Sequence, residues 1–340
     1  MQSNKMVLDN KLKTNISSKE ILNFLKRFQS YIGLILVIIV ASIICVRNGE
    51  NLFLDGPNFA NIIRAVSENG IIAIGMTLVI LLGGIDLSVG AILGIVATGV
   101  ADLMVRKNFG LVESIIIVLL IGLAYGFFNG YISSKLKIQA FIVTLATMSI
   151  ARGFARSWSG GAGIAIPYGD GEGLAPEAFS ILGERFWGIP VPAICFIILG
   201  IIFTILLSKT KFGRHVYAVG GNETAAHLSG INVNRVKVLC FMLCGLMASI
   251  AGIIHAAQLS QGAPNAGMGY ELNAVAAVCI GGTSLAGGKG TIIGTIVGAL
   301  TLGVLDNMLG LKGIDSNTQL VVKGFIIILA VFMQADRKQN

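Results

Sequence analysis

The sequence predicts an all-α polytopic membrane protein, with about ten transmembrane helices and an internal repeat. Apolar residues make up 54% of the chain and charged residues 12%, whereas soluble domains carry about 25% charged residues. Runs of about 20 apolar residues, each long enough to cross a bilayer as a helix, recur from Ile32 to Met333. The 44 glycines suit helices that pack closely in lipid.

The apolar runs divide the chain into tails, spans and loops. Ten candidate spans follow from hydropathy, at 31–46, 62–82, 87–104, 112–132, 139–155, 190–208, 236–256, 272–286, 291–309 and 318–334. The transmembrane domain is thus predicted at 31–334, between tails at 1–30 and 335–340. An even number of spans places both termini on one side. Most basic residues fall in the segments on that side, so the positive-inside rule makes it the cytoplasm.

Two long polar loops interrupt the spans. The loop at 157–190, rich in turn-forming residues, is expected outside, and the basic loop at 208–237 in the cytoplasm. The second loop contains a short helix signature, because Asn222 can cap a helix that Gly230 can end, and Glu223 favours its first turn. A helix of this length is unstable alone in water. It is therefore expected to pack either on its own protein or in a partner.

Two glycine-rich stretches resemble each other and suggest the repeat. The stretch "GGIDLSVGAILG" at 83–94 aligns with "GGTSLAGGKGTIIG" at 281–294 after a two-residue insertion, and both face the cytoplasm in this topology, which makes the repeat parallel. Glycine-interrupted segments at corresponding positions of two halves point to a transport pathway, and the alternative is a chance match. The glycines expected to break helices or gate the path are Gly83, Gly84, Gly281, Gly282, Gly287 and Gly288.

No stretch carries the residues of a catalytic, nucleotide or metal site. The second glycine-rich stretch fails as a phosphate-binding loop, because Lys289 is followed by Gly290 rather than by Ser or Thr. The five cysteines lie in or beside apolar stretches, and no histidine completes a metal set with them. We therefore expect a protein that is not an enzyme, with no ATPase site, cofactor or metal of its own. Its net charge of +8 reflects membrane topology rather than nucleic-acid binding.

Polar residues within the spans are candidates for a translocation path. They are Asp86, Ser88, Asn129, Thr144, Thr283 and Ser284. A charge inside a bilayer is costly, so Asp86 invites a functional interpretation, but its carboxylate can instead cap the next helix by accepting a nearby backbone N–H. For the whole set, the alternative is interhelical hydrogen bonding. Elsewhere, Asp306 faces either a cavity or the outer interface, Lys323 can snorkel, and His255 is expected at an interface.

Four stretches carry a resemblance to a known family. They are "GMTLVILLGGIDLSVGA" (75–91), "KIQAFIVTLATMSIARG" (137–153), "TKFGRHVYAVGGNETAAHLSGINVNRVK" (210–237) and "GYELNAVAAVCIGGTSLAGGKGTIIGT" (269–295). In this order and spacing they resemble the permease subunits of bacterial ATP-binding-cassette importers, in the ribose-type monosaccharide branch. The resemblance covers nearly the whole chain. It departs from the family at Asn273, where relatives often carry aspartate.

The resemblance implies a function and a set of partners. A monosaccharide, ribose first, would move inward by alternating access, driven by a separate cytoplasmic ATP-binding-cassette ATPase. A second permease copy and an external or periplasmic sugar-binding protein would complete the importer in the bacterial plasma membrane. The family's coupling motif matches Glu223, Ala225, Ala226 and Gly230, so this segment, capped by Asn222, would dock in the ATPase.

Other interpretations stay open at this point. The same branch includes permeases for other sugars, inositol and a furanose signalling molecule, and permeases for branched-chain amino acids are related. An ion-coupled secondary transporter of a small polar solute would use a buried acid, for which Asp86 is the candidate, but it leaves the coupling segment unexplained. An intramembrane enzyme would need a nucleophile with a base, or metal ligands, within the spans, and the sequence shows neither.

Overall fold

The computed structural model describes residues 18–47 and 49–335, so the predicted tails lie largely outside the described residues, at 1–17 and 336–340. The helices are α2 (Ser18–Ile44), α3 (Gly56–Leu81), α4 (Val89–Val105), α5 (Leu111–Lys135), α6 (Ala140–Ser159), α7 (Val191–Lys209), α8 (Lys211–Gly221), α9 (Glu223–Leu228), α10 (Val233–Leu259), α11 (Tyr270–Ile280), α12 (Ile292–Leu311) and α13 (Ser316–Ala335), with a 3₁₀ helix η2 (Glu177–Gly183). Two-residue strands pair antiparallel as β1 (Val46–Arg47) with β2 (Glu50–Asn51), β3 (Ile164–Ala165) with β6 (Gln261–Gly262), and β4 (Arg185–Phe186) with β5 (Ile189–Pro190).

The predicted all-α architecture is confirmed, and each of the ten predicted spans overlaps one helix. Within the described residues, α3, α5, α7, α10 and α12 are long and apolar enough to cross a membrane. Two further helices, α4 and α11, and the part of α2 from Gln29 to Ile44 are shorter apolar helices. The exact number of crossings and the internal repeat therefore remain predictions.

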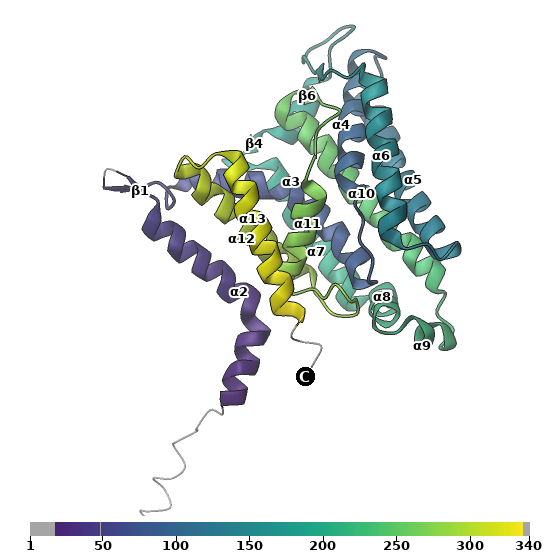
Figure 1. Ribbon diagram of the computed structural model, residues 1–340. Helices are drawn as coiled ribbons and strands as arrows, with labels where there is room; N and C mark the ends of the chain where they lie inside the picture. Colours follow the sequence, from purple (N-terminus) through teal and green to yellow (C-terminus); the bar gives the residue numbers. More distant parts are fainter. Residues whose placement is uncertain (1–17, 48, 336–340) are drawn as a thin grey trace, which may run out of the picture.

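The bundle has two distinct ends (Figure 1). Strands β1, β4 and β6 lie at one end, which we call the hairpin end, and α8 and α9 lie at the other, which we call the α9 end. Helix α2 starts, and α13 finishes, toward the α9 end, so the first and last described residues share it. Helix α2 begins at Ser18, well inside the predicted tail at 1–30, because the amphipathic segment before the apolar run continues the same helix.

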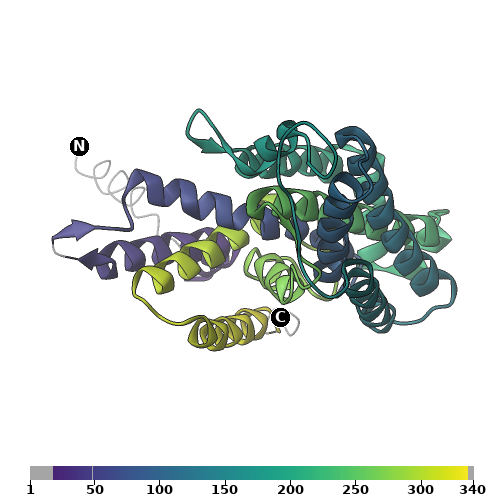
Figure 2. The same ribbon diagram turned by 90° about the horizontal axis from the view of Figure 1, so that it is seen from above.

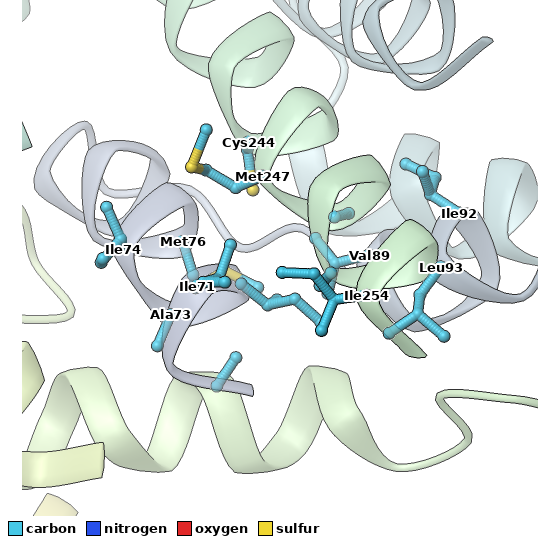
Figure 3. Packing of buried hydrophobic residues seen from close by; sticks show 14 of the residues in the cluster. Ile71, Ala73, Ile74, Met76, Val89, Ile92, Leu93, Cys244, Met247 and Ile254 are labelled. Atoms are coloured by element: carbon cyan, nitrogen blue, oxygen red, sulfur yellow. The ribbon is translucent and has the colours of Figure 1, made fainter. Parts of the chain in front are cut away.

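Helix α4 lies at the centre of the bundle. Every residue of α4 except Val105 is buried, which explains why its sequence is apolar on all sides. Figure 3 shows Val89, Ile92 and Leu93 of α4 among the buried side chains of α3 and α10, including Met76 and Ile254. This contact of three helices forms the core of the bundle.

Helices α5 and α10 pack with their backbones close together. Glycines recur on α5 at every fourth position, 122, 126 and 130, and face the backbone of α10. A Cβ on Gly126 would lie 2.7 Å from the Cα of Met242, and one on Gly130 would lie 2.7 Å from the Cα of Val238. Such small-residue faces allow close helix contact where lipid provides no hydrophobic driving force between helices.

A non-helical segment at 263–269 joins β6 to α11 and runs beside α4 (Figure 1). Irregular backbone inside a membrane needs hydrogen-bond partners from the protein. The Arg152 guanidinium of α6 supplies them, because its Nη1 donates to the carbonyls of Pro264 and Ala266, both at 2.7 Å. The segment therefore lets α11 start inside the bundle rather than at its surface.

Segments far apart in the sequence lie side by side on one flank. In the view of Figure 2, the purple helices near the N-terminus and the yellow helices near the C-terminus lie together, with the teal helices on the other flank. Helix α12 contacts both α2 and α3, and α13 contacts α11. Polar side chains from widely separated parts of the chain can therefore meet on this flank.

Candidate functional site

Helix α9 is a short helix that is capped at both ends. The Asn222 side chain accepts a hydrogen bond from the Ala225 backbone N–H at 2.9 Å, which is the cap that the sequence predicts. At the other end, Gly230 has a φ of +82°, and the Ile231 N–H donates to the Ala226 carbonyl at 3.1 Å. This is the glycine-dependent C-cap that ends many helices, and it returns the chain towards α10.

The outer face of α9 is open to solvent. Ala226 faces the protein with 4% exposure, whereas the Leu228 side chain is 83% exposed. Beside α9, a hollow of about 780 Å³ separates it from Lys137 in the loop between α5 and α6. Leu136, next to Lys137 in the same loop, is also exposed, at 62%. Exposed apolar residues rimmed by polar ones are typical of a surface that binds another protein.

Glu223, in the first turn of α9, pairs with Lys237 near the start of α10. Its Oε2 accepts a hydrogen bond from the lysine Nζ at 2.7 Å. The Glu223 side chain is 57% exposed, and exposed ion pairs contribute only about 0–1 kcal/mol to stability. Stability alone therefore does not account for a glutamate at this position.

Helix α8, which the sequence analysis missed, joins α7 to α9. The Thr210 side chain caps it by accepting from the Gly213 N–H at 3.2 Å, and Val216 and Val219 are buried. The threonine cap and the valines at i and i+3 are sequence signals that were available for it. Helix α8 thus fixes α9 to the helical bundle.

Both glycine-rich stretches meet at the end of α8. The Gly288 N–H donates to the Leu81 carbonyl at the end of α3, at 2.8 Å. The Tyr217 hydroxyl of α8 donates to the Gly290 carbonyl at 2.8 Å. Burial raises the pKa of Tyr217, so its hydroxyl remains a proton donor. The loop between α11 and α12 is therefore bonded to α3 on one side and to α8 on the other.

Two glycines of this loop have no room for a side chain. Gly287 and Gly288 have φ values of +87° and +72°. A Cβ on Gly287 would lie 2.8 Å from the Gly220 carbonyl oxygen, and one on Gly288 would lie 2.9 Å from the Gly221 Cα. We call this contact of the α3 end, the α11–α12 loop and the α8 end the glycine junction.

The other predicted glycines lie at helix ends beside this junction. Helix α3 ends at Leu81, just before Gly83 and Gly84, and α11 ends at Ile280, with Gly281 as its C-cap and Gly282 following. The two stretches that resemble each other are thus in direct contact. Gating by these glycines remains a prediction.

Four of the six predicted path residues form one buried network with Thr147. The Ser88 N–H and hydroxyl both donate to Asp86 Oδ1, at 2.9 and 2.5 Å. The Asn129 amide donates to the Ser88 hydroxyl at 2.9 Å, and Thr147 donates to Asn129 Oδ1 at 2.7 Å. The Thr144 hydroxyl accepts from the backbone N–H of residue 87 at 3.1 Å.

The network joins the α3–α4 connection to α5 and α6. Asp86, Ser88, Asn129 and Thr144 have 0% exposure. Asp86 accepts a backbone N–H two residues on, as its capping interpretation predicts, but the cap position of α4 itself is Ser88. Asp86 Oδ2 has no hydrogen-bond partner among the described residues.

The remaining two path residues lie apart from that network, in the loop between α11 and α12. Thr283 is fully buried, and its side chain packs against Gly290. The Ser284 N–H donates to the Lys289 carbonyl at 2.8 Å, and its hydroxyl accepts from the Ala286 N–H at 3.3 Å. These contacts keep the loop in the compact form that reaches α3 and α8.

Comparison with known proteins identifies the family. Residues 58–331 match the model of the family described as branched-chain amino acid transport system, permease component. The chain belongs to this family. It is a polytopic membrane protein of a transport permease class, as the resemblance predicted.

Curated relatives of the permease include several sugar transport proteins. It is 44% identical to the ribose import permease protein RbsC of Bacillus subtilis (strain 168), over 93% of this chain and 94% of that protein. It is 46% identical to RbsC of Escherichia coli (strain K12), over 83% and 86% of the two chains. It is 39% identical to the L-arabinose transport system permease protein AraH of the same strain, over the same shares. No solved structure matches the permease with statistical significance.

One buried charged cluster in the permease escaped sequence analysis. Glu68 of α3 accepts hydrogen bonds at Oε2 from the Tyr270 hydroxyl, at 3.2 Å, and lies 2.8 Å from His255 Nδ1. His255 therefore packs inside the bundle, with 12% side-chain exposure, and its expected position at the membrane interface remains a prediction. Glu68 lies between Ser67 and Asn69, inside the predicted span at 62–82, and an acid within a span is a signal that the sequence did offer.

Proposed function

We propose that this chain is the membrane-spanning permease subunit of an ATP-binding-cassette importer that moves ribose into the cell. The observation that carries the proposal is the continuous path of contacts from the exposed helix α9, through α8, to the glycine junction. A docking helix that is joined through α8 to the α11–α12 loop, and through that loop to the end of α3, suits transport driven by another protein. Ribose is favoured because the two relatives at 44% and 46% identity are both named ribose import permeases.

The geometry suggests how work done outside the membrane reaches the helices. An ATPase subunit would hold α9 by Leu228 and by the hollow beside it. When the ATPase closes, α8 and α9 would move as one body, because Asn222 alone separates them. Tyr217 would pass this movement to the loop just before α12, and Gly288 of that loop would pass it to the end of α3. Alternating access would then follow as a rigid-body change between two states of similar energy.

The orientation and the partners follow from the same proposal. The α9 end would be cytoplasmic, and both termini would lie on that side. Ten spans would cross the bacterial plasma membrane. The chain itself would have no ATPase site. The loop at 157–190, at the hairpin end, would receive an external or periplasmic sugar-binding protein. A second permease copy would complete the importer. Other sugars, inositol or a furanose signalling molecule remain alternative cargoes.

We also retain a role in the route for the six predicted path residues. In this structure, Asp86, Ser88, Asn129 and Thr144 are buried and bonded to one another or to the backbone around them. They would become accessible when the α9 end opens. Alanine at each position should lower uptake by the folded permease, and unchanged uptake at all of them would rule out this route.

A second candidate function is an ion-coupled secondary transporter. The observation that favours it is the buried cluster of Glu68, His255 and Tyr270, since buried acids and histidines serve as ion and proton sites in such transporters. It would predict ribose uptake driven by a proton or sodium gradient, without any ATPase. It leaves the exposed face of α9 without a role.

The proposal is tested by replacing Glu223 and Gly230 with alanine, separately, in the permease expressed together with its ATPase. We expect less ATPase to co-purify and less ATP-dependent uptake of radiolabelled ribose into reconstituted vesicles. Lys237→Met is the matched control, because it breaks the ion pair but leaves α9 intact, and we expect it to transport. Uptake by the permease alone, without an ATPase, would contradict the proposal and favour ion coupling.

A further inference from the structure

A polar cavity of about 440 Å³ lies between α3, α11, α12 and α13. Its lining includes positions 61–69 of α3 and 299–307 of α12. Because α3 starts, and α12 finishes, near the hairpin end, the cavity extends from that end to about the middle of these helices. Its volume falls within the usual range for small-molecule sites, about 300–1,000 Å³.

The lining is unusually polar for a space inside a helical membrane bundle. Its polar side chains are Asn61, Asn69, Asn273, Asn307, Tyr270 and the pair formed by Asp306 and Lys323. The apolar part of the lining comes from small or branched residues, such as Ala65 and Leu302. Amides carry both donors and acceptors, so several of them around one space suit a ligand that has many hydroxyl groups.

Two acceptors in this cavity are unused. Asn69 Oδ1 and Asp306 Oδ1 are buried and have no hydrogen-bond partner among the described residues. Leaving a buried acceptor unpaired costs about 1–3 kcal/mol, so natural sites usually pair it with a ligand, a water or another group. Both unused groups are hydrogen-bond acceptors. A single partner that pairs with both must therefore carry at least two hydrogen-bond donors.

The charges in the cavity point to a neutral ligand. Lys323 Nζ lies 2.8 Å from Asp306 Oδ2, so the two charges balance each other. An anion or a cation would need a surplus of the opposite charge, which this lining does not have. The Tyr270 ring adds an aromatic surface, and its hydroxyl donates to Glu68 Oε2 at 3.2 Å.

We propose that this cavity is a monosaccharide-binding site within the membrane domain, in which Asn69 and Asp306 accept hydrogen bonds from sugar hydroxyls. The proposal rests on the proposed function and adds a location and named ligand contacts to it. The sugar would be held by neutral amide groups and by apolar contacts at Ala65 and Leu302, and no covalent step is involved.

A protection experiment tests this site without relying on ATP. Cysteine at Ala65, an exposed residue of the lining, gives a thiol at the cavity for a water-soluble reagent, and the parent chain gives the background from its five native cysteines. The assembled importer in vesicles would be labelled with and without millimolar ribose. We expect ribose to slow labelling of A65C severalfold, and Asn69→Leu to abolish this protection. Asn317→Leu makes the same chemical change at an exposed position outside the lining and should leave protection intact.

The outcomes separate this site from the proposed function. Labelling that ribose does not slow would overturn the site, even if ATP-dependent ribose uptake is normal, and so would protection that survives N69L. Protection lost only in N69L, with no ATP-dependent uptake by the unmodified importer, would support the site and overturn the proposed function. A tenfold or greater fall in ribose uptake by N69L, with ATP hydrolysis retained, would support both.

Discussion

At the α9 end, three backbone segments pack directly on one another, whereas between α3, α11, α12 and α13 polar side chains surround open space. The glycine junction leaves no room for a Cβ at Gly287 or Gly288, and its hydrogen bonds join the α11–α12 loop to the end of α3 and to Tyr217 of α8. The cavity holds unused acceptors on Asn69 and Asp306. Close backbone contact suits the transmission of movement, and unused polar groups suit the binding of a ligand. The α9 end therefore suits coupling to the ATPase, and the cavity suits binding of the cargo.

The largest effect is expected from a side chain in the glycine junction. In Gly288→Ala, the new methyl would meet the Gly221 backbone, which cannot move aside without shifting α8. Overpacking of this kind costs about 1–3 kcal/mol, in addition to about 1–2 kcal/mol for a positive φ. We expect a folded but strongly impaired importer, measured as ATP-dependent ribose uptake per assembled complex.

Gly313→Ala is the matched control for this change. Gly313 has a φ of +71°, close to that of Gly288, but its Cβ would meet no described atom within 4 Å. It therefore isolates the effect of backbone strain. If G313A and G288A lose uptake equally, contact at the junction is not what matters, and the comparison between the two regions fails.

A smaller effect is expected in the network between α4, α5 and α6. Asn129→Leu keeps the volume but removes the donor to Ser88 and the acceptor for Thr147. The loss of partners in a buried network costs about 1–3 kcal/mol. We expect a lower melting temperature of the purified permease, followed with a dye that reacts with cysteines as they become exposed. An unchanged melting temperature would mean that the network adds little to stability.

The smallest effect on stability is expected at the cavity. Asn69→Ala removes a buried oxygen that has no partner, so the loss of packing is offset by relief of an unpaired acceptor, and the free energy of unfolding should not fall. Thermal unfolding of the purified permease measures this. A large loss of stability would show that Asn69 is a structural residue and that the cavity resembles the tightly packed α9 end after all.

The two regions also differ in how far the sequence predicts them. The sequence predicts the α9 segment because helix caps are local. Asn222 accepts a hydrogen bond from the N–H of Ala225, three residues later, and Gly230 lies just after the end of the helix. The composition of the glycine stretches predicts that they break helices. The hydrogen bond between Gly288 and Leu81, which brings the two stretches together, depends on tertiary packing and does not follow from the local sequence.

The cavity could not be predicted in the same way. Its polar residues come one or a few from each of four helices, and Asn69 and Asp306 lie far apart in the sequence. Each belongs to a short polar group within a predicted span, and nothing in the sequence shows that the two groups face the same space. The sequence leaves open whether Asp306 faces a cavity or the outer interface, and in the structure it lines the cavity. Its pairing with Lys323 depends on how α12 and α13 pack.

The most direct test compares Leu228→Asp at the α9 end with Asn69→Leu in the cavity, in one preparation of the importer with its ATPase. Two quantities are measured for each variant: the amount of ATPase that co-purifies with the permease, and ATP-dependent ribose uptake into vesicles. The account predicts that L228D loses both, because it places a charge on the docking face, whereas N69L keeps the ATPase and loses only uptake. If L228D retains the ATPase and transports normally, or if N69L loses the ATPase as well, the separation of the two regions is wrong.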